Sequence, residues 1–164
     1  FIDRTKLVQQ TLERPALSTD VIVGFPGETE AEFAETLAVC EEVGFSKIHI
    51  FPFSPRKGTP AATMPLQVPP TVKRERVERL TRLGESLRDR YYETLRGTRL
   101  EVLVEGELPS SGSPNQVPTV AGTACRYATV EIQAGSPEVR LPRRSEMVSV
   151  VAGETRDGRI QATL

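Results

Sequence analysis

The first half of the chain carries hydrophobic residues at two different spacings. Residues 3–14 have apolar side chains at helical intervals, and Pro15 ends that pattern because proline disfavours helix in the residue before it. Residues 20–25 form a short β-branched apolar run, which predicts a strand buried on both faces. Residues 29–44 return to helical spacing, and residues 47–53 predict a second strand. The order strand, helix, strand predicts a parallel βαβ unit with a right-handed connection.

A capping box opens the helix between the two strands. The Thr29 hydroxyl can accept a hydrogen bond from the amide of Glu32, and the Glu32 carboxylate can accept one from the amide of Thr29. Gly44 tolerates the left-handed conformation that often ends a helix. The side chains that this helix would bury are Phe33, Leu37 and Cys40. Cys40 is therefore interpreted as a core residue rather than a reactive thiol.

The second half changes from helical to alternating spacing. Residues 52–70 hold six of the thirteen prolines and predict a stiff, extended surface segment. Residues 71–96 predict a long amphipathic helix that ends at Gly97, with Val77, Leu80, Leu87, Tyr91 and Leu95 on its apolar side. Alternating segments then predict strands at residues 99–105, 119–124, 128–133, 146–152 and 159–163, with a polar loop at residues 106–118.

These elements predict an α/β unit followed by an all-β unit. We place the α/β unit at residues 1–97, and a small, closed or nearly closed β-barrel at residues 98–164. A covered parallel sheet of two strands leaves both strands with an unpaired edge, so we expect the α/β unit to be incomplete. The chain begins at Phe1 rather than at methionine, and we expect it to be a piece of a longer protein.

Length, charge and cysteine usage narrow the possible functions. The chain has 164 residues, and none of its apolar runs approaches the roughly 20 residues of a membrane span, so we expect a soluble, cytoplasmic protein with no membrane partner. Basic and acidic residues number six and nine over residues 1–70, eight and five over residues 71–97, and seven and eight over residues 98–164. The small net charge of −1 argues weakly against a dedicated nucleic-acid protein. Cys40 and Cys125 are too far apart in sequence to form a thiolate cluster.

Candidate chemistry gathers where the two predicted strands end, which is where ligands bind in parallel α/β folds. Gly24, Gly27 and the following helix N-terminus offer close approach to the backbone and a preference for anions, or simply make a tight turn. Residues 51–60 supply aromatic, hydroxyl and cationic groups suited to a nucleoside or phosphate ligand, or form a proline-rich surface loop. His49 lies within a strand, where a hydrogen-bonded structural role is more common than acid–base catalysis.

Two long segments give a resemblance to a known family. Residues 20–29 read DVIVGFPGET, and residues 45–61 read FSKIHIFPFSPRKGTPA. Both closely resemble the radical S-adenosylmethionine methylthiotransferases. Residues 97–105 (GTRLEVLVE) and 122–130 (GTACRYATV) look like the C-terminal TRAM domain of that family, an OB-like RNA-binding β-barrel. The resemblance implies a partial radical S-adenosylmethionine (β/α) barrel followed by a TRAM domain.

Within this family, three branches differ in substrate. The context of His49 and Pro52 and the segment at residues 56–61 look most like the MtaB branch, which adds a methylthio group to C2 of N6-threonylcarbamoyladenosine at position 37 of tRNA. The MiaB branch, which acts on isopentenyladenosine, is a close alternative. The RimO branch modifies an aspartate of a ribosomal protein and usually has acidic residues after the serine that matches Ser54, whereas Pro55 follows here.

The resemblance implies S-adenosylmethionine and [4Fe–4S] clusters as cofactors. It places the adenosyl group against Ile22 and Gly24, and the adenine beside Phe51 and Phe53. The CxxxCxxC loop that holds the reducing cluster, and the N-terminal domain that carries a second cluster, are absent from these residues. We therefore expect the chain to depend on missing N-terminal domains of its own protein, to bind neither cofactor tightly and to be catalytically inert alone.

The expected macromolecular partner is tRNA, bound through the barrel. Arg126 and Tyr127 supply a cation and a stacking face on a turn between strands, a combination that suits RNA backbone and unstacked bases. Arg140, Arg143 and Arg144 extend this predicted RNA-binding surface, or are ordinary surface residues. Two other hypotheses stay open: a non-enzymatic RNA-binding module, and a radical enzyme similar to the oxygen-independent coproporphyrinogen oxidases, which have a similar glycine turn.

Overall fold

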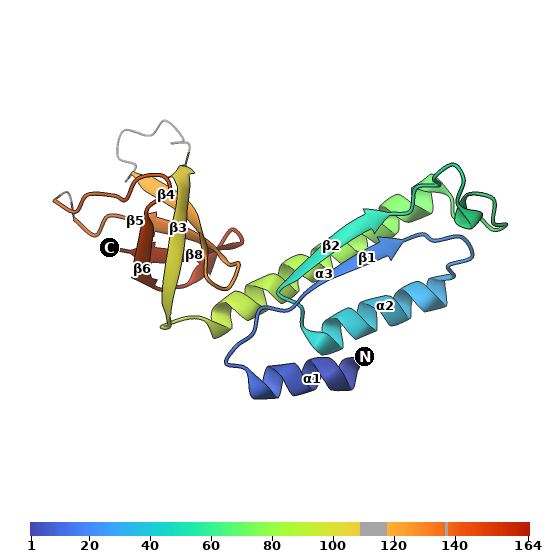
Figure 1. Cartoon of the computed structure of the whole chain (residues 1–164), viewed down its shortest axis with the longest axis horizontal. Helices are drawn as coiled ribbons and strands as arrows, with labels where there is room; N and C mark the ends of the chain where they lie inside the picture. The colour runs from blue at the N-terminus through green and yellow to red at the C-terminus, as the bar shows by residue number, and fades with distance from the viewer. Residues whose placement is uncertain (109–117, 137) are drawn as a thin grey trace. The chain divides into compact units, whose positions relative to one another are not determined.

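The computed structural model is a mixed α/β chain with two compact units, Phe1–Arg88 and Asp89–Leu164 (Figure 1). It describes residues 1–108, 118–136 and 138–164. Most of the loop predicted at residues 106–118 lies outside the described residues. The boundary between the units falls within one helix, α3 (Pro70–Thr94), whose first turns belong to the first unit and whose last turns belong to the second.

The first unit contains the predicted parallel βαβ arrangement. Strands β1 (Ser18–Val23) and β2 (Lys47–Pro52) pair in parallel, with register partners from Ser18↔Lys47 to Val23↔Pro52. The other elements of this unit are α1 (Ile2–Thr11), α2 (Glu30–Val43), a short 3₁₀ turn η1 (Pro60–Ala62) and most of α3. Helix α1 ends at Thr11, three residues before the end predicted for it, and none of its residues is buried.

Helix α2 begins and ends as its sequence predicts. The Thr29 hydroxyl accepts from the Glu32 amide at 3.2 Å, and the Glu32 carboxylate accepts from the Thr29 amide at 2.7 Å. Gly44 ends the helix with φ of 68°, in the left-handed region where glycine carries no steric penalty. Phe33 and Cys40 are buried, as predicted for this helix.

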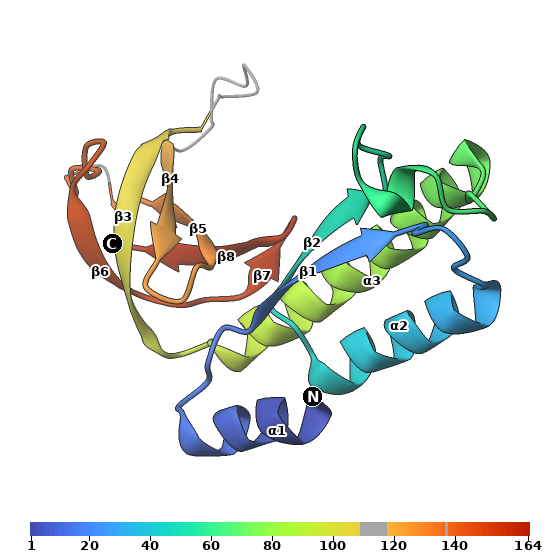
Figure 2. The same cartoon turned by 45° about the vertical axis from the view of Figure 1, so that its right-hand side comes forward.

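Only one face of the β1–β2 pair is covered by the described residues. Val23 is buried, and Val21, Ile48 and Ile50 pack in the same core as Phe33 and Leu80 of helices α2 and α3. On the other face, Ile22 is 57% exposed. The prediction that residues 20–25 are buried on both faces is therefore wrong, because the buried residues of α2 and α3 belong to the same core as Val23. Figures 1 and 2 show these helices beside the β1–β2 pair.

The second unit is a curled six-stranded sheet with the order β6-β3-β4-β5-β8-β7. Neighbouring strands are antiparallel, except that β5 and β8 are parallel. The five predicted strands are all present, and the two-residue β7 was not predicted. Their bounds are β3 (Arg99–Glu107), β4 (Thr119–Ala124), β5 (Thr129–Gln133), β6 (Met147–Val151), β7 (Thr155–Arg156) and β8 (Arg159–Thr163).

The sheet is curled (Figure 2), and its buried side chains form one apolar core. Inward and outward residues alternate along β3, where Leu100 and Val102 are fully buried. The chain just after β6 contacts β8, where the Gly153 amide donates to the Gln161 carbonyl at 2.7 Å. Tyr92 and Leu95, at the end of α3 and just beyond it, pack into this core. The result is a half-barrel whose core includes the end of a helix.

Two leucines on β3 test which side chains of this strand point into the core and which point outward. Leu100→Ala should lower the free energy of unfolding of the second unit by about 2–5 kcal/mol, because Leu100 is fully buried. Leu103→Ala, on the same strand but 44% exposed, should cost clearly less, about 1 kcal/mol or below. The chain has three tyrosines, Tyr91, Tyr92 and Tyr127, and no tryptophan, so tyrosine fluorescence during urea unfolding reports on this unit alone. Equal losses in the two variants would contradict the assignment.

Candidate functional site

The candidate site lies where β1 and β2 end. The amide of Phe53 donates to the carbonyl of Val23 at 2.8 Å, which continues the strand pairing beyond β2. Ile22 and Phe51 are register partners with side chains 57% and 51% exposed, so they form an exposed apolar pair. The ring of Phe25 meets that of Phe53 edge to face, with centroids 5.2 Å apart. Three predicted site residues, Ile22, Phe51 and Phe53, therefore lie together at the strand ends.

Gly24 is buried beneath a lysine of α3. Its φ of +76° suits glycine, and a Cβ placed on it would lie too close to Cγ of Lys73 for any side chain to fit without a shift. The Lys73 ammonium donates to the carbonyl of Phe53 at 2.9 Å. The close approach to the backbone that the sequence suggests at Gly24 is thus made by Lys73, which holds the ends of both strands.

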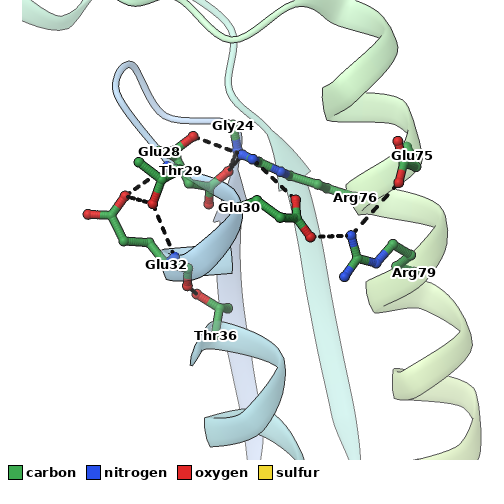
Figure 3. A network of polar contacts seen from close by, with 9 residues as sticks. All are labelled: Gly24, Glu28, Thr29, Glu30, Glu32, Thr36, Glu75, Arg76 and Arg79. Carbon is green, nitrogen blue, oxygen red and sulfur yellow. Dashed lines mark hydrogen bonds and ion pairs between the residues drawn. The ribbon is translucent and has the colours of Figure 1, made fainter. Parts of the chain in front are cut away.

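A second residue of α3, Arg76, reaches the turn after β1 (Figure 3). The Glu28 carboxylate accepts from the Gly24 amide at 2.7 Å and from Nη1 of Arg76 at 2.5 Å. Arg76 Nη1 also donates to the backbone carbonyl of Glu28 at 3.1 Å. The side chains of Arg76 and Glu28 are only 5% and 13% exposed. This chain of contacts from Gly24 through Glu28 to Arg76 is called the turn lock below.

The N-terminus of α2 carries three acidic residues of its own. Glu28 holds the Gly24 amide, and Glu32 completes the capping box. The Thr29 backbone amide, followed by the Thr29 hydroxyl, holds the pKa of Glu32 below its ordinary value. The hydrogen bond from Arg79 is the main cause that lowers the pKa of Glu30. Carboxylates of the chain itself therefore lie at the helix end that the sequence suggests for an anion.

The segment after β2 returns to this turn. The Gly27 amide donates to the carbonyl of Leu66 at 2.9 Å, so the proline-rich stretch folds back onto the loop between β1 and α2. Arg56 and Lys57 are exposed in a turn closed by the Thr59 amide, which donates to the Arg56 carbonyl at 3.1 Å. His49 is exposed on the same face as Phe51.

In the second unit, Tyr127 occupies a strained and exposed position. It lies in the turn between β4 and β5, where its amide donates to the carbonyl of Ala124 at 2.8 Å. Its φ is +56°, in the left-handed region that costs a residue other than glycine about 1 kcal/mol or more. Its side chain is 82% exposed. The turn therefore presents a large aromatic ring to solvent at a position where glycine is the less strained residue.

The neighbouring Arg126 is held against Tyr91 of α3. Burial raises the pKa of Tyr91, and the charge and hydrogen bond of the Arg126 guanidinium oppose that rise. Arg126 is therefore oriented by the protein, while the adjacent tyrosine points to solvent.

The structure separates the two predicted groups of RNA-binding residues. The turn with Arg126 is tied to β3 on the β4 side, through the Cys125 amide and the Glu101 carbonyl at 2.8 Å. The turn with Arg143 and Arg144 is tied to β3 on the β6 side, through the Ser145 amide and the Val104 carbonyl at 2.8 Å. The predicted RNA-binding residues therefore form two groups that flank β3. Arg140 binds Glu146 at 3.2 Å in the second group.

No group of three or more His, Cys, Asp or Glu side chains suited to a metal ion occurs within the described residues. Cys40 is buried in α2, and this burial raises its pKa, whereas Cys125 is exposed in the other unit. None of the described helices is long and apolar enough to cross a membrane.

Lys73 and Arg76 are the residues of this site that sequence reasoning missed. Both lie in the predicted amphipathic helix at residues 71–96, where the pattern identified only the apolar side chains. One signal was available: Arg76 lies four residues before Leu80, and therefore on the apolar side of that helix.

The chain is similar to part of several tRNA-modifying enzymes, although no family model matches it. A tRNA-2-methylthio-N(6)-dimethylallyladenosine synthase of Bifidobacterium adolescentis is 45% identical over 138 residues, which are 84% of this chain and 28% of that protein. The Moorella thermoacetica protein of the same name is 50% identical over 102 residues, or 62% of this chain and 22% of that protein. The threonylcarbamoyladenosine tRNA methylthiotransferase MtaB of Bacillus subtilis is 47% identical over 105 residues, or 64% and 23%. The chain spans about a quarter of the length of these relatives.

The capping box of α2 predicts a measurable titration. The pKa of Glu32 should lie below its ordinary value of 4.5, so the stabilisation of α2 should be complete above that pH and should be lost as the pH falls through the lowered pKa. NMR titration of the side-chain carboxyl carbon measures this pKa directly. Thr29→Ala removes the hydroxyl contact and should move the pKa back towards 4.5. A wild-type pKa at or above 4.5 would contradict the structure.

Proposed function

We propose that the protein to which these residues belong is a radical S-adenosylmethionine tRNA methylthiotransferase. The observation that carries the proposal is the 45% identity over 138 of the 164 residues to an enzyme whose name gives a 2-methylthio adenosine of tRNA as its product, and the radical S-adenosylmethionine chemistry rests on the family resemblance of residues 20–29 and 45–61. An alignment of that length reaches both units. The first unit would then be part of the radical S-adenosylmethionine barrel, and the curled sheet of the second unit would be its TRAM-like RNA-binding domain.

The preferred substrate under this proposal is N6-threonylcarbamoyladenosine at position 37 of tRNA. It rests on the resemblance of residues 56–61, and of the context of His49 and Pro52, to the MtaB branch. A dimethylallyladenosine substrate is the second candidate, favoured by the 50% identity to the Moorella thermoacetica protein. In either case the product carries a new methylthio group at C2 of the adenine.

The strand ends offer a place for the adenosyl group of S-adenosylmethionine. When bound, this cofactor and the [4Fe–4S] clusters supply the radical and the methylthio group. The exposed pair of Ile22 and Phe51 presents apolar surface of the kind that packs against a ribose or an adenine. Phe53 would border the same site. Gly24, which packs against the Lys73 side chain, would hold the end of β1 in place. The role of these residues is to bind and orient the adenosyl group.

The described residues do not fit an iron–sulfur cluster. Such a cluster needs several thiolates at short range, whereas Cys40 is buried in the first unit and Cys125 belongs to the second. We therefore propose that cluster ligands come from other segments of the protein, and that these residues alone are inactive. In this proposal the chain contributes part of the adenosyl site and a surface for tRNA.

The proposed tRNA contact centres on Tyr127. A strained backbone at an exposed aromatic residue points to function, because the ring of Tyr127 is 82% exposed and does not belong to the apolar core of the described residues. Its ring is available for stacking on an unpaired base, and Arg126 beside it carries the charge for a phosphate. Arg143 and Arg144 form a second cationic group on the other side of β3. A tRNA that contacts both groups would have to cross β3.

The modified nucleosides of the source organism test the proposed reaction. Deletion of the gene should abolish 2-methylthio-N6-threonylcarbamoyladenosine in total tRNA, measured by liquid chromatography and mass spectrometry. Its unmethylthiolated precursor should accumulate in step, and the intact gene should restore the product. Loss of the dimethylallyl product instead would select the second candidate. Unchanged levels of both methylthio nucleosides, in an organism that makes them, would overturn the proposed activity.

Tyr127 gives a second test, in which stability and affinity move in opposite directions. Tyr127→Gly should stabilise the second unit, because glycine relieves the positive φ. The same change should weaken tRNA binding by about 1–3 kcal/mol, the usual contribution of one base stacked on an aromatic ring. Tyr127→Phe is the matched control, since it keeps the ring and should bind nearly as well as the wild type. Filter binding at several salt concentrations measures the affinities, and a glycine variant with wild-type affinity would remove Tyr127 from the interface.

A further inference from the structure

The turn lock ties the end of β1 to the middle of α3 through buried groups. The Gly24 amide and Arg76 Nη1 both donate to the Glu28 carboxylate, at 2.7 and 2.5 Å. Gly24 follows β1 directly and lies two residues after Ile22, half of the exposed apolar pair. The lock therefore fixes the backbone next to the candidate adenosyl site.

Arg76 has more buried polar groups than Glu28 can satisfy. Its Nε is buried and has no hydrogen-bond partner within the described residues. The guanidinium lies over the ring of Phe33, 5.3 Å from its centroid, which offers a cation partial compensation. Arg76 Nη2 also donates to the Glu30 carboxylate, but this contact is long, 3.5 Å, and the Glu30 side chain is 61% exposed. Glu28 is therefore the main buried partner of the guanidinium, and removal of either member of the Arg76–Glu28 pair should release the turn.

Lys73 connects α3 to the end of the second strand, β2. It lies three residues before Arg76, on the same side of α3, and its ammonium binds the Phe53 carbonyl. Its stem packs on Gly24. One stretch of α3 thus contacts the residues that follow both β1 and β2, and it can set the spacing between the two halves of the candidate site.

We propose that Glu28 and Arg76 are positioning residues for the strand-end site, holding the Gly24 turn in the conformation that binds the adenosyl group. The inference rests on the proposed function. The contacts of the lock are to the Gly24 amide and to α3, so neither residue is assigned a contact with the cofactor. Their effect would pass through the position of Gly24 and of the strand end before it.

Arg79, three residues after Arg76 on α3, provides a matched control. It donates to Glu30 at 2.6 Å, and its guanidinium lies 4.9 Å from the centroid of the same Phe33 ring. Its side chain is 31% exposed, and its described contacts reach neither Gly24 nor Glu28. The two arginines therefore share a helix and an aromatic neighbour, but only Arg76 belongs to the turn lock. Glu30 is not a matched control, because it also accepts from Arg76.

The first measurement follows the turn in the 164-residue chain without any cofactor. Glu28→Gln and Arg76→Lys should speed hydrogen exchange of the Gly24 amide at least about tenfold, because the acceptor becomes neutral or loses its partner. Arg79→Lys should leave that rate within about twofold of the wild type. Exchange of the α2 amides, recorded together with that of Gly24, shows whether each variant is folded. Unchanged Gly24 exchange in a folded Glu28→Gln or Arg76→Lys chain would overturn the inference.

The second measurement uses the whole protein with its clusters reconstituted. Equilibrium dialysis should show S-adenosylmethionine affinity about tenfold lower in Glu28→Gln and Arg76→Lys, and unchanged in the Arg79→Lys control. The KM for S-adenosylmethionine should rise by a similar factor, with kcat at saturation close to that of the wild type. A purely structural role would lower the melting temperature without this change in affinity, and that result would overturn the proposal. Failure of the wild-type protein to bind S-adenosylmethionine would instead overturn the proposed function, on which the inference rests.

Discussion

The buried guanidinium of Arg76 is the constraint on which the first unit depends. A cation that is almost fully removed from water needs a partner, and removal of one member of such a pair costs about 3–5 kcal/mol. Arg76 finds that partner in Glu28, whose carboxylate also holds the Gly24 amide. The packing of α3 and the conformation of the turn after β1 therefore depend on the same Glu28 carboxylate, so a change in one affects the other.

Local sequence signals predicted the elements of both units well, because each signal reflects a short-range physical preference. The capping box at Thr29 and the left-handed Gly44 depend only on neighbouring residues, and both are confirmed. The parallel pairing of β1 and β2 followed from the length of the connection between them. Burial was harder to predict: Ile22 and Val23 belong to one apolar run, but helices cover only the side of Val23. Periodicity cannot tell which face of a strand lacks a neighbour.

The candidate site was predicted in its apolar part and missed in its polar part. The strand ends were identified from fold rules, and the structure places Ile22, Phe51 and Phe53 there. Lys73 and Arg76 were overlooked because a helix rich in charge resembles a solvated helix all along its length. What distinguishes Arg76 from Arg79 is a tertiary fact, the position of Glu28 at the end of the β1 turn. Likewise, the sequence does not reveal the positive φ of Tyr127, since tyrosine is not a residue that favours it.

The uncovered face of the β1–β2 pair bears on the proposed function. Parallel strands are normally covered on both faces, and two strands alone make a marginal sheet. Here the helices supply one cover, while Ile22 and Phe51 remain side by side on the other face. In the proposed enzyme, cofactor and further segments of the protein would cover this apolar pair. The turn lock would then hold the strand end rigid from the covered side. A ligand that binds on the open side would not have to order the backbone, so its binding would be stronger.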